Sequence, residues 1–328
     1  MGYGSAQPQP KRAAMPDILS PPAGGFFHEA VLYSSDDEFL DGTLQFVRDG
    51  FELGARTLVV VDRAKARALR ADLEQDGGKV YFADIEHLGR NPACLIPAWA
   101  RFVQEHAANG PLRGVGEPVW PTRTSPELAE CHLHEHLLNV AFAPDVDLWL
   151  RCPYDAQRLA PGVLAGVRDT HNAVVRDRVS MSVELDPSRV WHDLQSELPD
   201  PPTPTRVHEF TDDAGVAELR ELVACRARAA GRSDEAVADF VLAVHEIATN
   251  SLRHGGGDGR ARLWRDDPWL VCEIRDRGWV TDPLAGRRAP GIDDLGGRGL
   301  WITNHLADLV QLRSSSEGTT VRVHTRVA

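Results

Sequence analysis

Short apolar runs alternate with longer amphipathic stretches through the first half of the chain. Three apolar runs end in Asp or Cys and are typical of buried strands: residues 57–62, 79–84 and 147–152. Four stretches have helical spacing: residues 36–53, 64–75, 95–108 and 125–141, the last with Ser125 as expected N-cap and Pro126 as first helical residue. Strands that alternate with helices of this length predict an α/β domain with a mostly parallel sheet.

The second half of the chain has a different order of elements. A short strand at residues 206–210 precedes two long helical patterns at 214–230 and 234–253, the second with Ser233 as its N-cap and with glycines after His254. Strand patterns follow at residues 260–265 and 269–275, then a glycine-rich loop and short helix at 296–306, and then two final strands. Helices followed by antiparallel strands predict a two-layer α+β sandwich.

A proline-dense stretch separates the two halves. Four prolines lie within residues 198–205, where they disfavour both a helix and a central strand. We therefore expect a flexible leader at residues 1–24, a first domain at 25–186, a linker at 187–205 and a second domain at 206–328.

The composition limits the classes of binding partner and the cellular compartment that we expect for this protein. The formal net charge of −12 disfavours direct nucleic-acid binding, because phosphate contacts need clustered positive charge. The five cysteines are scattered without a CxxC pair, which is typical of a reducing cytoplasm. No apolar run approaches the ~20 residues that span a bilayer, so we expect a cytoplasmic protein without a membrane contact.

The strongest chemical pattern lies on the helix at residues 234–253. Glu246, Asn250 and His254 recur every four residues and therefore share one helix face. An asparagine that can ligate a hard cation, beside a carboxylate that can accept a proton, fits Mg-nucleotide chemistry. Taken alone, the same pattern also fits a solvated helix face.

Three further elements suit a nucleotide. Asp276 follows a strand and precedes Gly278, so its carboxylate could accept a hydrogen bond from an exocyclic amine such as that of adenine. The glycines at 296, 297 and 299 run into a helix N-terminus, which attracts phosphates, and Arg298 adds a cation. Residues 317–320, with Thr319, join the last two strands; alone, they fit a simple hairpin turn.

In this order and spacing, the four elements resemble the N, G1, G2 and G3 boxes of the GHKL ATPase superfamily, whose domain has the Bergerat ATP-binding fold. The short E-I-A-T-N-S-L-R-H form resembles the anti-sigma-factor serine/threonine kinases. The resemblance implies that ATP and Mg²⁺ bind, that Asn250 ligates Mg²⁺ and that Glu246 is the general base or orients the nucleophile. It places Asp276 on adenine and the remaining candidates around the nucleotide: Arg253, His254, Gly278, Gly297, Arg298, Gly299 and Thr319. The expected lid, residues 279–295, matches no known lid pattern in its charged residues: Asp282, Arg287, Arg288, Asp293 and Asp294.

The first domain resembles the MEDS sensory domain, which is related to RecA-like ATPases. Four motifs carry the resemblance, at residues 27–33, 116–121, 130–135 and 152–155. No GxxxxGK[ST] phosphate loop is present, so a ligand-sensing RecA-like domain without ATP hydrolysis is expected.

The candidate sensory pocket comprises His28, Cys131, His134 and Cys152, with His28 and Cys152 expected near strand ends, where α/β folds bind ligands. His132 and His136 offer a metal-binding alternative at i,i+4 spacing, but they lack the HExxH glutamate, and polar packing or small-molecule contact is the favoured interpretation.

These patterns predict an anti-sigma regulatory factor. It would bind ATP-Mg, sequester a sigma factor and phosphorylate a STAS-type anti-anti-sigma factor, under control of a small-molecule signal at the first domain. An ATP-dependent binding switch without kinase activity is the alternative, and homodimerisation stays open. A sensor histidine kinase is disfavoured, because the segment around His192 is too short for a two-helix hairpin.

Overall fold

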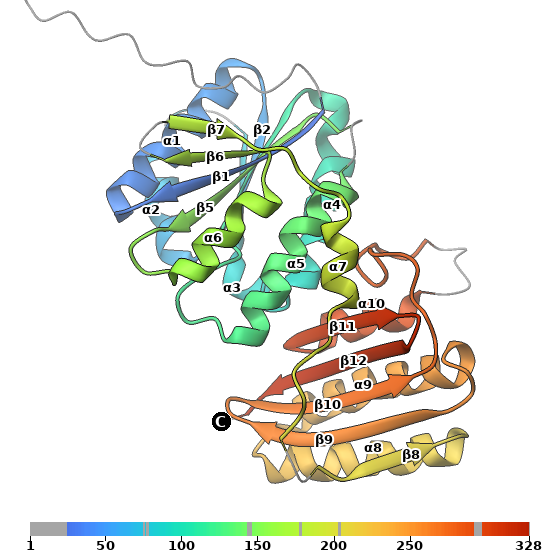
Figure 1. The fold of residues 1–328 in the computed structure, drawn as a ribbon. Coiled ribbons are helices and arrows are strands. Elements are labelled where there is room, and N and C mark those ends of the chain that lie inside the picture. Colours follow the sequence, from blue (N-terminus) through green and yellow to red (C-terminus); the bar gives the residue numbers. More distant parts are fainter. Residues whose placement is uncertain are drawn as a thin grey trace, which may run out of the picture.

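The computed structural model describes residues 25–327 except residues 75, 77–78, 143–145, 177–178, 203–204 and 292–296. Figure 1 shows two domains in this part of the chain. The first has a seven-stranded, mostly parallel sheet, and the second has a five-stranded antiparallel sheet. The predicted fold class, a parallel α/β domain followed by an α+β sandwich, is confirmed.

The first sheet has the strand order β3-β2-β4-β5-β1-β6-β7, in which only β7 is antiparallel to its neighbour. Its strands are β1 (Phe26–Tyr33), β2 (Arg56–Val61), β3 (Val80–Asp84), β4 (Leu112–Gly116), β5 (Leu148–Asp155), β6 (Ala173–Arg176) and β7 (Val179–Ser182). The helices are α1 (Asp36–Glu52), α2 (Arg63–Leu73), α3 (Ile85–Leu88), α4 (Leu95–His106), α5 (Ser125–Ala141) and α6 (Pro161–Thr170), with 3-10 turns η1 (Pro92–Cys94) and η2 (Ala107–Asn109).

Alternate residues of β2 enter two different cores. Val59 and Val61 pack with α1 and α2 on one face of the sheet, whereas Leu58 and Val60 pack with α4 and α5 on the other. Both faces are therefore covered, which explains why the parallel strands are apolar throughout rather than alternating.

The start of α5 corrects one sequence prediction. The N-cap is Thr124 and not Ser125, and Pro126 lies in the first turn. Glu127 accepts hydrogen bonds from the Thr124 backbone N–H at 2.7 Å and from its hydroxyl at 2.8 Å. This reciprocal capping box fixes the first turn one residue earlier than the Ser-Pro pair suggested.

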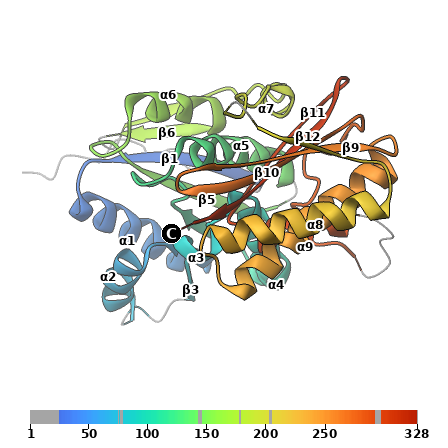
Figure 2. The same ribbon diagram turned by 90° about the horizontal axis from the view of Figure 1, so that it is seen from below.

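The second domain has the strand order β11-β12-β10-β9-β8. Its strands are β8 (Val207–Phe210), β9 (Gly259–Asp266), β10 (Trp269–Asp276), β11 (Leu309–Ser315) and β12 (Gly318–Arg326), and its helices are α8 (Asp213–Ala229), α9 (Asp234–His254) and α10 (Arg298–Leu306). Ser233 caps α9 as predicted, accepting a hydrogen bond from the Ala236 N–H at 3.3 Å. Figure 2 shows α8 and α9 side by side along the sheet, and their apolar faces form the core with it.

Helix α7 (Arg189–Gln195) lies in the segment interpreted as the linker and packs between the domains. Its Val190 and Leu194 are buried in the core of the first domain, while the helix also contacts β11 (Figure 1). The domain boundaries taken from the sequence remain a proposal. The first part of the expected linker forms α7 and packs on the first domain.

Carboxylates of α5 pair with arginines of the second domain. Glu130, fully buried, has its Oε1 2.8 Å from Arg313 Nη2 and its Oε2 3.5 Å from Arg287 Nη2. Glu127 Oε1 accepts a hydrogen bond from Arg326 Nη2 at 2.8 Å. Two arginines of one domain therefore share a single buried carboxylate of the other, so loss of this carboxylate would leave both guanidinium groups without their counter-charge.

Among the described residues, no helix combines the length and the apolar character that crossing a bilayer requires.

Candidate functional site

The polar stripe of α9 lies against the N-terminus of α10. Glu246 and Asn250 are both half-buried. A Cβ added to Gly299 would lie 2.8 Å from Asn250 Nδ2 and 3.1 Å from Glu246 Oε2, so a larger residue would displace the ends of these two side chains. The N-terminus of α10, the positive end of its helix dipole, therefore lies beside a carboxylate and an amide.

Asp276 ends β10 with its carboxylate fixed from two sides. It accepts hydrogen bonds from Ser251 Oγ at 2.6 Å and from the Gly278 N–H at 2.8 Å. Gly255 packs directly on it, since a Cβ there would lie 2.4 Å from Asp276 Cγ. A carboxylate has about four acceptor positions, so capacity remains for a ligand amine. Ser251 was missed as a site residue, although it lies one position after Asn250 within the same motif.

Thr319 holds the turn after Asp276. Its hydroxyl donates to the Gly278 carbonyl at 2.8 Å and pairs with Ser314 Oγ at 2.7 Å, which in turn accepts from the Val280 N–H at 2.8 Å. The resulting cleft has a volume of about 90 Å³, and its lining includes five predicted site residues: Asn250, His254, Asp276, Gly278 and Thr319.

The remaining predicted residues lie around this cleft. Gly297 is the N-cap of α10, and Arg298 is exposed in its first turn. Arg253 is exposed near the end of α9 and does not line the cleft. Gly296, Asp293 and Asp294 lie outside the described residues.

The described part of the predicted lid, residues 279–291, is fastened to the first domain. Arg287 is buried against Glu130, and burial lowers its pKa. Leu284 lies in the apolar core of the first domain. Asn304 Nδ2 donates to the Gly286 carbonyl at 2.9 Å, and Asn91 Nδ2 of the first domain donates to the Asn304 carbonyl at 2.9 Å. The lid thus contacts α5 directly, and Asn304 of α10 links it to Asn91, the residue before η1.

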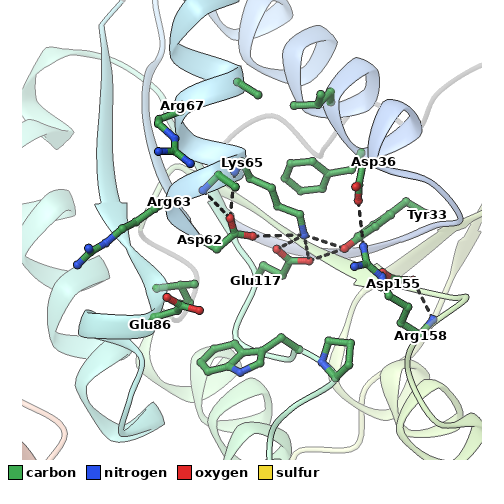
Figure 3. Close-up of a pocket in the computed structure, with 17 residues that line it drawn as sticks. Tyr33, Asp36, Asp62, Arg63, Lys65, Arg67, Glu86, Glu117, Asp155 and Arg158 are labelled. Carbon is green, nitrogen blue, oxygen red and sulfur yellow. Dashed lines mark hydrogen bonds and ion pairs between the residues drawn. The ribbon is translucent and has the colours of Figure 1, made fainter.

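A second pocket of about 630 Å³ opens at the carboxyl edge of the parallel sheet (Figure 3). Tyr33, Asp62, Glu117 and Asp155, at or directly after the ends of β1, β2, β4 and β5, line it. This is the edge at which open α/β sheets bind ligands, and the volume suits a small molecule. We call it the edge pocket.

Lys65 organises the floor of the edge pocket. Its Nζ donates to both Glu117 carboxylate oxygens at 2.6 Å and to Tyr33 Oη at 2.9 Å, and it lies 4.5 Å from the centre of the Phe39 ring (Figure 3). Burial raises the pKa of Glu117, and Lys65 opposes that shift. Burial and then Glu117 raise the pKa of Tyr33, which stays protonated and donates to Glu117 at 2.6 Å.

We expect Glu117→Gln to cost about 1.5–3 kcal/mol of stability, the usual contribution of a hydrogen bond to a charged group. Urea unfolding of Glu117→Gln, Lys65→Met and the double variant measures it, and the double variant should lose less than the sum of the two single losses. Glu105→Gln, which removes an exposed i,i+4 partner of Arg101, is the matched control and should show no measurable change. Strictly additive losses would contradict a coupled network.

The residues predicted as a sensory pocket lie elsewhere and do not line the edge pocket. His28 Nε2 lies 3.3 Å from Cys152 Sγ, but both residues are buried along β1 and β5, away from the carboxyl edge. Cys131 donates to the Pro118 carbonyl, and burial raises its pKa to about 12. Burial lowers the pKa of His134 to about 3.

His132 and His136, the metal-binding alternative of the sequence analysis, both face Asp193 of α7. Lys65 was missed because an isolated lysine in an amphipathic helix gives no signal. The sequence signal that could have located the edge pocket is Asp62, which follows a strand and caps the next helix.

The architecture and the cleft define a protein that joins a sensory-type α/β domain to an ATPase-type domain. Residues 27–172 match the family model of MEDS, the methanogen/methylotroph DcmR sensory domain, and residues 211–325 match that of the histidine kinase-like ATPase domain. Both domain resemblances inferred from the motifs are confirmed.

Among solved structures, the chain is similar to the RsbU and RsbW domains of Rv1364c from Mycobacterium tuberculosis, with 19% sequence identity and a TM-score of 0.27. The similarity covers 38% of this chain and 33% of that chain, so this chain spans about a third of that structure's length. The comparison with curated proteins gives no match.

Proposed function

We propose that this protein is an anti-sigma regulatory kinase whose ATPase domain is controlled by its sensory domain. The ATPase domain binds ATP-Mg, holds a sigma factor and phosphorylates a serine or threonine of a STAS-type anti-anti-sigma factor. The observation that carries the proposal is the contact of Glu246 and Asn250 with the α10 N-terminus at Gly299. The match of residues 211–325 to the ATPase family supports it.

The residues around Gly299 fit a Mg-nucleotide. Asn250 brings an amide oxygen, a hard donor of the kind that Mg²⁺ accepts, to a cradle that a single added Cβ would fill. The metal would neutralise phosphate charge during transfer. The N-terminus of α10 receives the phosphates, and the fixed carboxylate of Asp276 accepts a hydrogen bond from the adenine amino group.

Glu246 takes the role of general base. Its Oε2 lies on the same side of Gly299 as Asn250, where the phosphates enter, and the residue is half-buried. A hydroxyl of the antagonist placed there donates its proton to the carboxylate as the oxygen attacks the γ-phosphorus, and ADP leaves.

One observation favours a second candidate, an ATP-dependent binding switch without phosphoryl transfer. The lid is buried against the first domain through Arg287 and Leu284, so closure over a nucleotide would change the domain contact. A sensor histidine kinase gains no support, because His192 lies on α7, a single seven-residue helix packed on the first domain.

Labelled ATP separates the two candidates. The full-length protein is incubated with Mg²⁺ and γ-labelled ATP together with purified STAS-domain proteins of the same organism. Label on a serine or threonine of one of them supports the kinase. ATP binding without any transfer to the full STAS set would instead favour the binding switch.

We expect Asn250→Ala and Asp276→Asn each to weaken nucleotide binding at least tenfold, about 1.4 kcal/mol. The first removes a donor from the phosphate end of the cleft, and the second replaces an acceptor oxygen with an amide that repels the adenine amine. Titration of a fluorescent ATP analogue measures both. Asp266→Asn, at the exposed end of β9, is the control. Unchanged affinity in both site variants would refute the nucleotide cleft.

A further inference from the structure

We propose that His28, Glu135, Cys152 and His171 bind a divalent transition-metal ion of the zinc class inside the sensory domain. They come from β1, α5, β5 and the residue after α6, and all are at most 2% exposed. One ligand atom from each lies within 4.8 Å of the other three. This cluster is separate from the ATP cleft and from the edge pocket.

The spacing suits tetrahedral coordination. Glu135 Oε2 lies 3.0 Å from His28 Nε2, 3.4 Å from His171 Nε2 and 3.6 Å from Cys152 Sγ, and His28 Nε2 lies 3.3 Å from Cys152 Sγ. Tetrahedral zinc bonds of about 2.0–2.3 Å place neighbouring ligand atoms about 3.3–3.6 Å apart. Two imidazoles, a thiolate and a carboxylate form a closed donor set of the kind that zinc accepts.

Hydrogen bonds behind the cluster orient His28. Asn139 Nδ2 donates to the carbonyls of Thr170 at 2.7 Å and Glu135 at 3.1 Å, so its Oδ1 is the atom that faces His28 Nδ1 at 3.3 Å. His28 therefore donates from Nδ1. Its Nε2 lone pair is left facing the centre of the cluster, which is the usual arrangement around a metal-ligating histidine.

His171 is oriented in the same way. Its Nδ1 lies 2.9 Å from the Val167 carbonyl, which can only accept, so the proton is on Nδ1. The Nε2 atom is buried without a hydrogen-bond partner among the described residues, as is Glu135 Oε1. Buried lone pairs directed at a carboxylate are costly unless a cation lies between them.

A protonated histidine paired with Glu135 is the competing explanation. With His28 protonated, the carboxylate would be satisfied and Cys152 Sγ would donate to Glu135 Oε2 at 3.6 Å, but His171 Nε2 would keep no hydrogen-bond partner among the described residues. A metal ion uses all four groups. It has a route of entry, because Glu135 and Thr170 line a pocket of about 360 Å³ between α5 and α6.

The experiment is cobalt titration of the full-length protein without an affinity tag. We expect about one ion per chain, with a thiolate-to-cobalt charge-transfer band and the intense visible bands of tetrahedral Co²⁺. Cys152→Ser should abolish the charge-transfer band, and His171→Gln should weaken cobalt binding at least tenfold. His87→Gln is the control; His87 is exposed on α3, belongs to neither group of potential metal ligands among the described residues, and its loss should leave the spectrum unchanged.

Two outcomes would overturn the proposal: a native protein that takes up no cobalt, or a charge-transfer band that survives in Cys152→Ser. The native measurement is decisive even if a variant fails to fold. A second measurement supports it independently. Zn²⁺ should raise the melting temperature of chelator-treated native protein, and an unchanged melting temperature would count against the site.

Discussion

Glu246→Gln is expected to lower phosphoryl transfer to the antagonist about 100-fold while ATP affinity stays nearly constant. Glutamine keeps the size and the hydrogen bonding of the side chain but cannot accept the hydroxyl proton. The nucleotide contacts assigned to Asn250, Asp276 and the α10 N-terminus remain in place. Single-turnover transfer of labelled phosphate, together with a fluorescent-nucleotide titration, measures the two effects separately.

Glu218→Gln is the matched control for Glu246→Gln. Glu218 is exposed on α8, away from the cleft, so neither transfer nor affinity should change. A Glu246→Gln protein with full transfer activity would exclude the general-base role and leave the binding switch as the better account.

Glu130→Gln is expected to destabilise the domain contact by about 3–5 kcal/mol, the usual cost of breaking a buried ion pair on one side. The amide keeps the volume but removes the negative charge that Arg287 and Arg313 share. Two guanidinium groups, each less than a tenth exposed, then lack their counter-charge. Urea unfolding measures the loss, and hydrogen exchange of residues 279–291 reports release of the lid.

The control for Glu130→Gln is Glu52→Gln, at the exposed end of α1. If the lid of Glu130→Gln exchanges at the native rate, the ion pairs do not hold the lid, and control of the cleft through α5 loses its basis. Faster hydrogen exchange of the lid, together with an altered nucleotide affinity, would show that the sensory domain influences the ATP site.

Much of the ATPase domain was predictable because its signals are local. Ser233 caps α9 as expected, and the helical spacing of Glu246 and Asn250 is enough to place them side by side.

The first domain was harder to predict from the sequence. The sequence of β4 is Leu-Arg-Gly-Val-Gly. Two glycines and a charged residue are unusual in a buried central strand, so this sequence does not predict one. Gly114 is required there because the Trp99 ring packs where a Cβ would lie.

Contacts between distant segments could not be read from the sequence. His28 and Cys152 meet because β1 pairs in parallel with β5, and Glu135 and His171 join them through the rotation of α5 and the end of α6. The motifs had grouped His28 and Cys152 with Cys131 and His134 of α5, whereas the structure brings them beside Glu135 and His171. The burial of Arg287 on Glu130 likewise depends on how the domains pack.

The packing of α7 on the first domain limits how far the two domains can part. Only residues 196–206, eleven residues, separate the end of α7 from the start of β8. Fully extended, such a segment reaches at most ~40 Å. A short tether of this kind holds the partners at roughly millimolar effective concentration. Separation and re-docking would thus be intramolecular, so a signal that opens the contact would act equally at any cellular abundance of the protein.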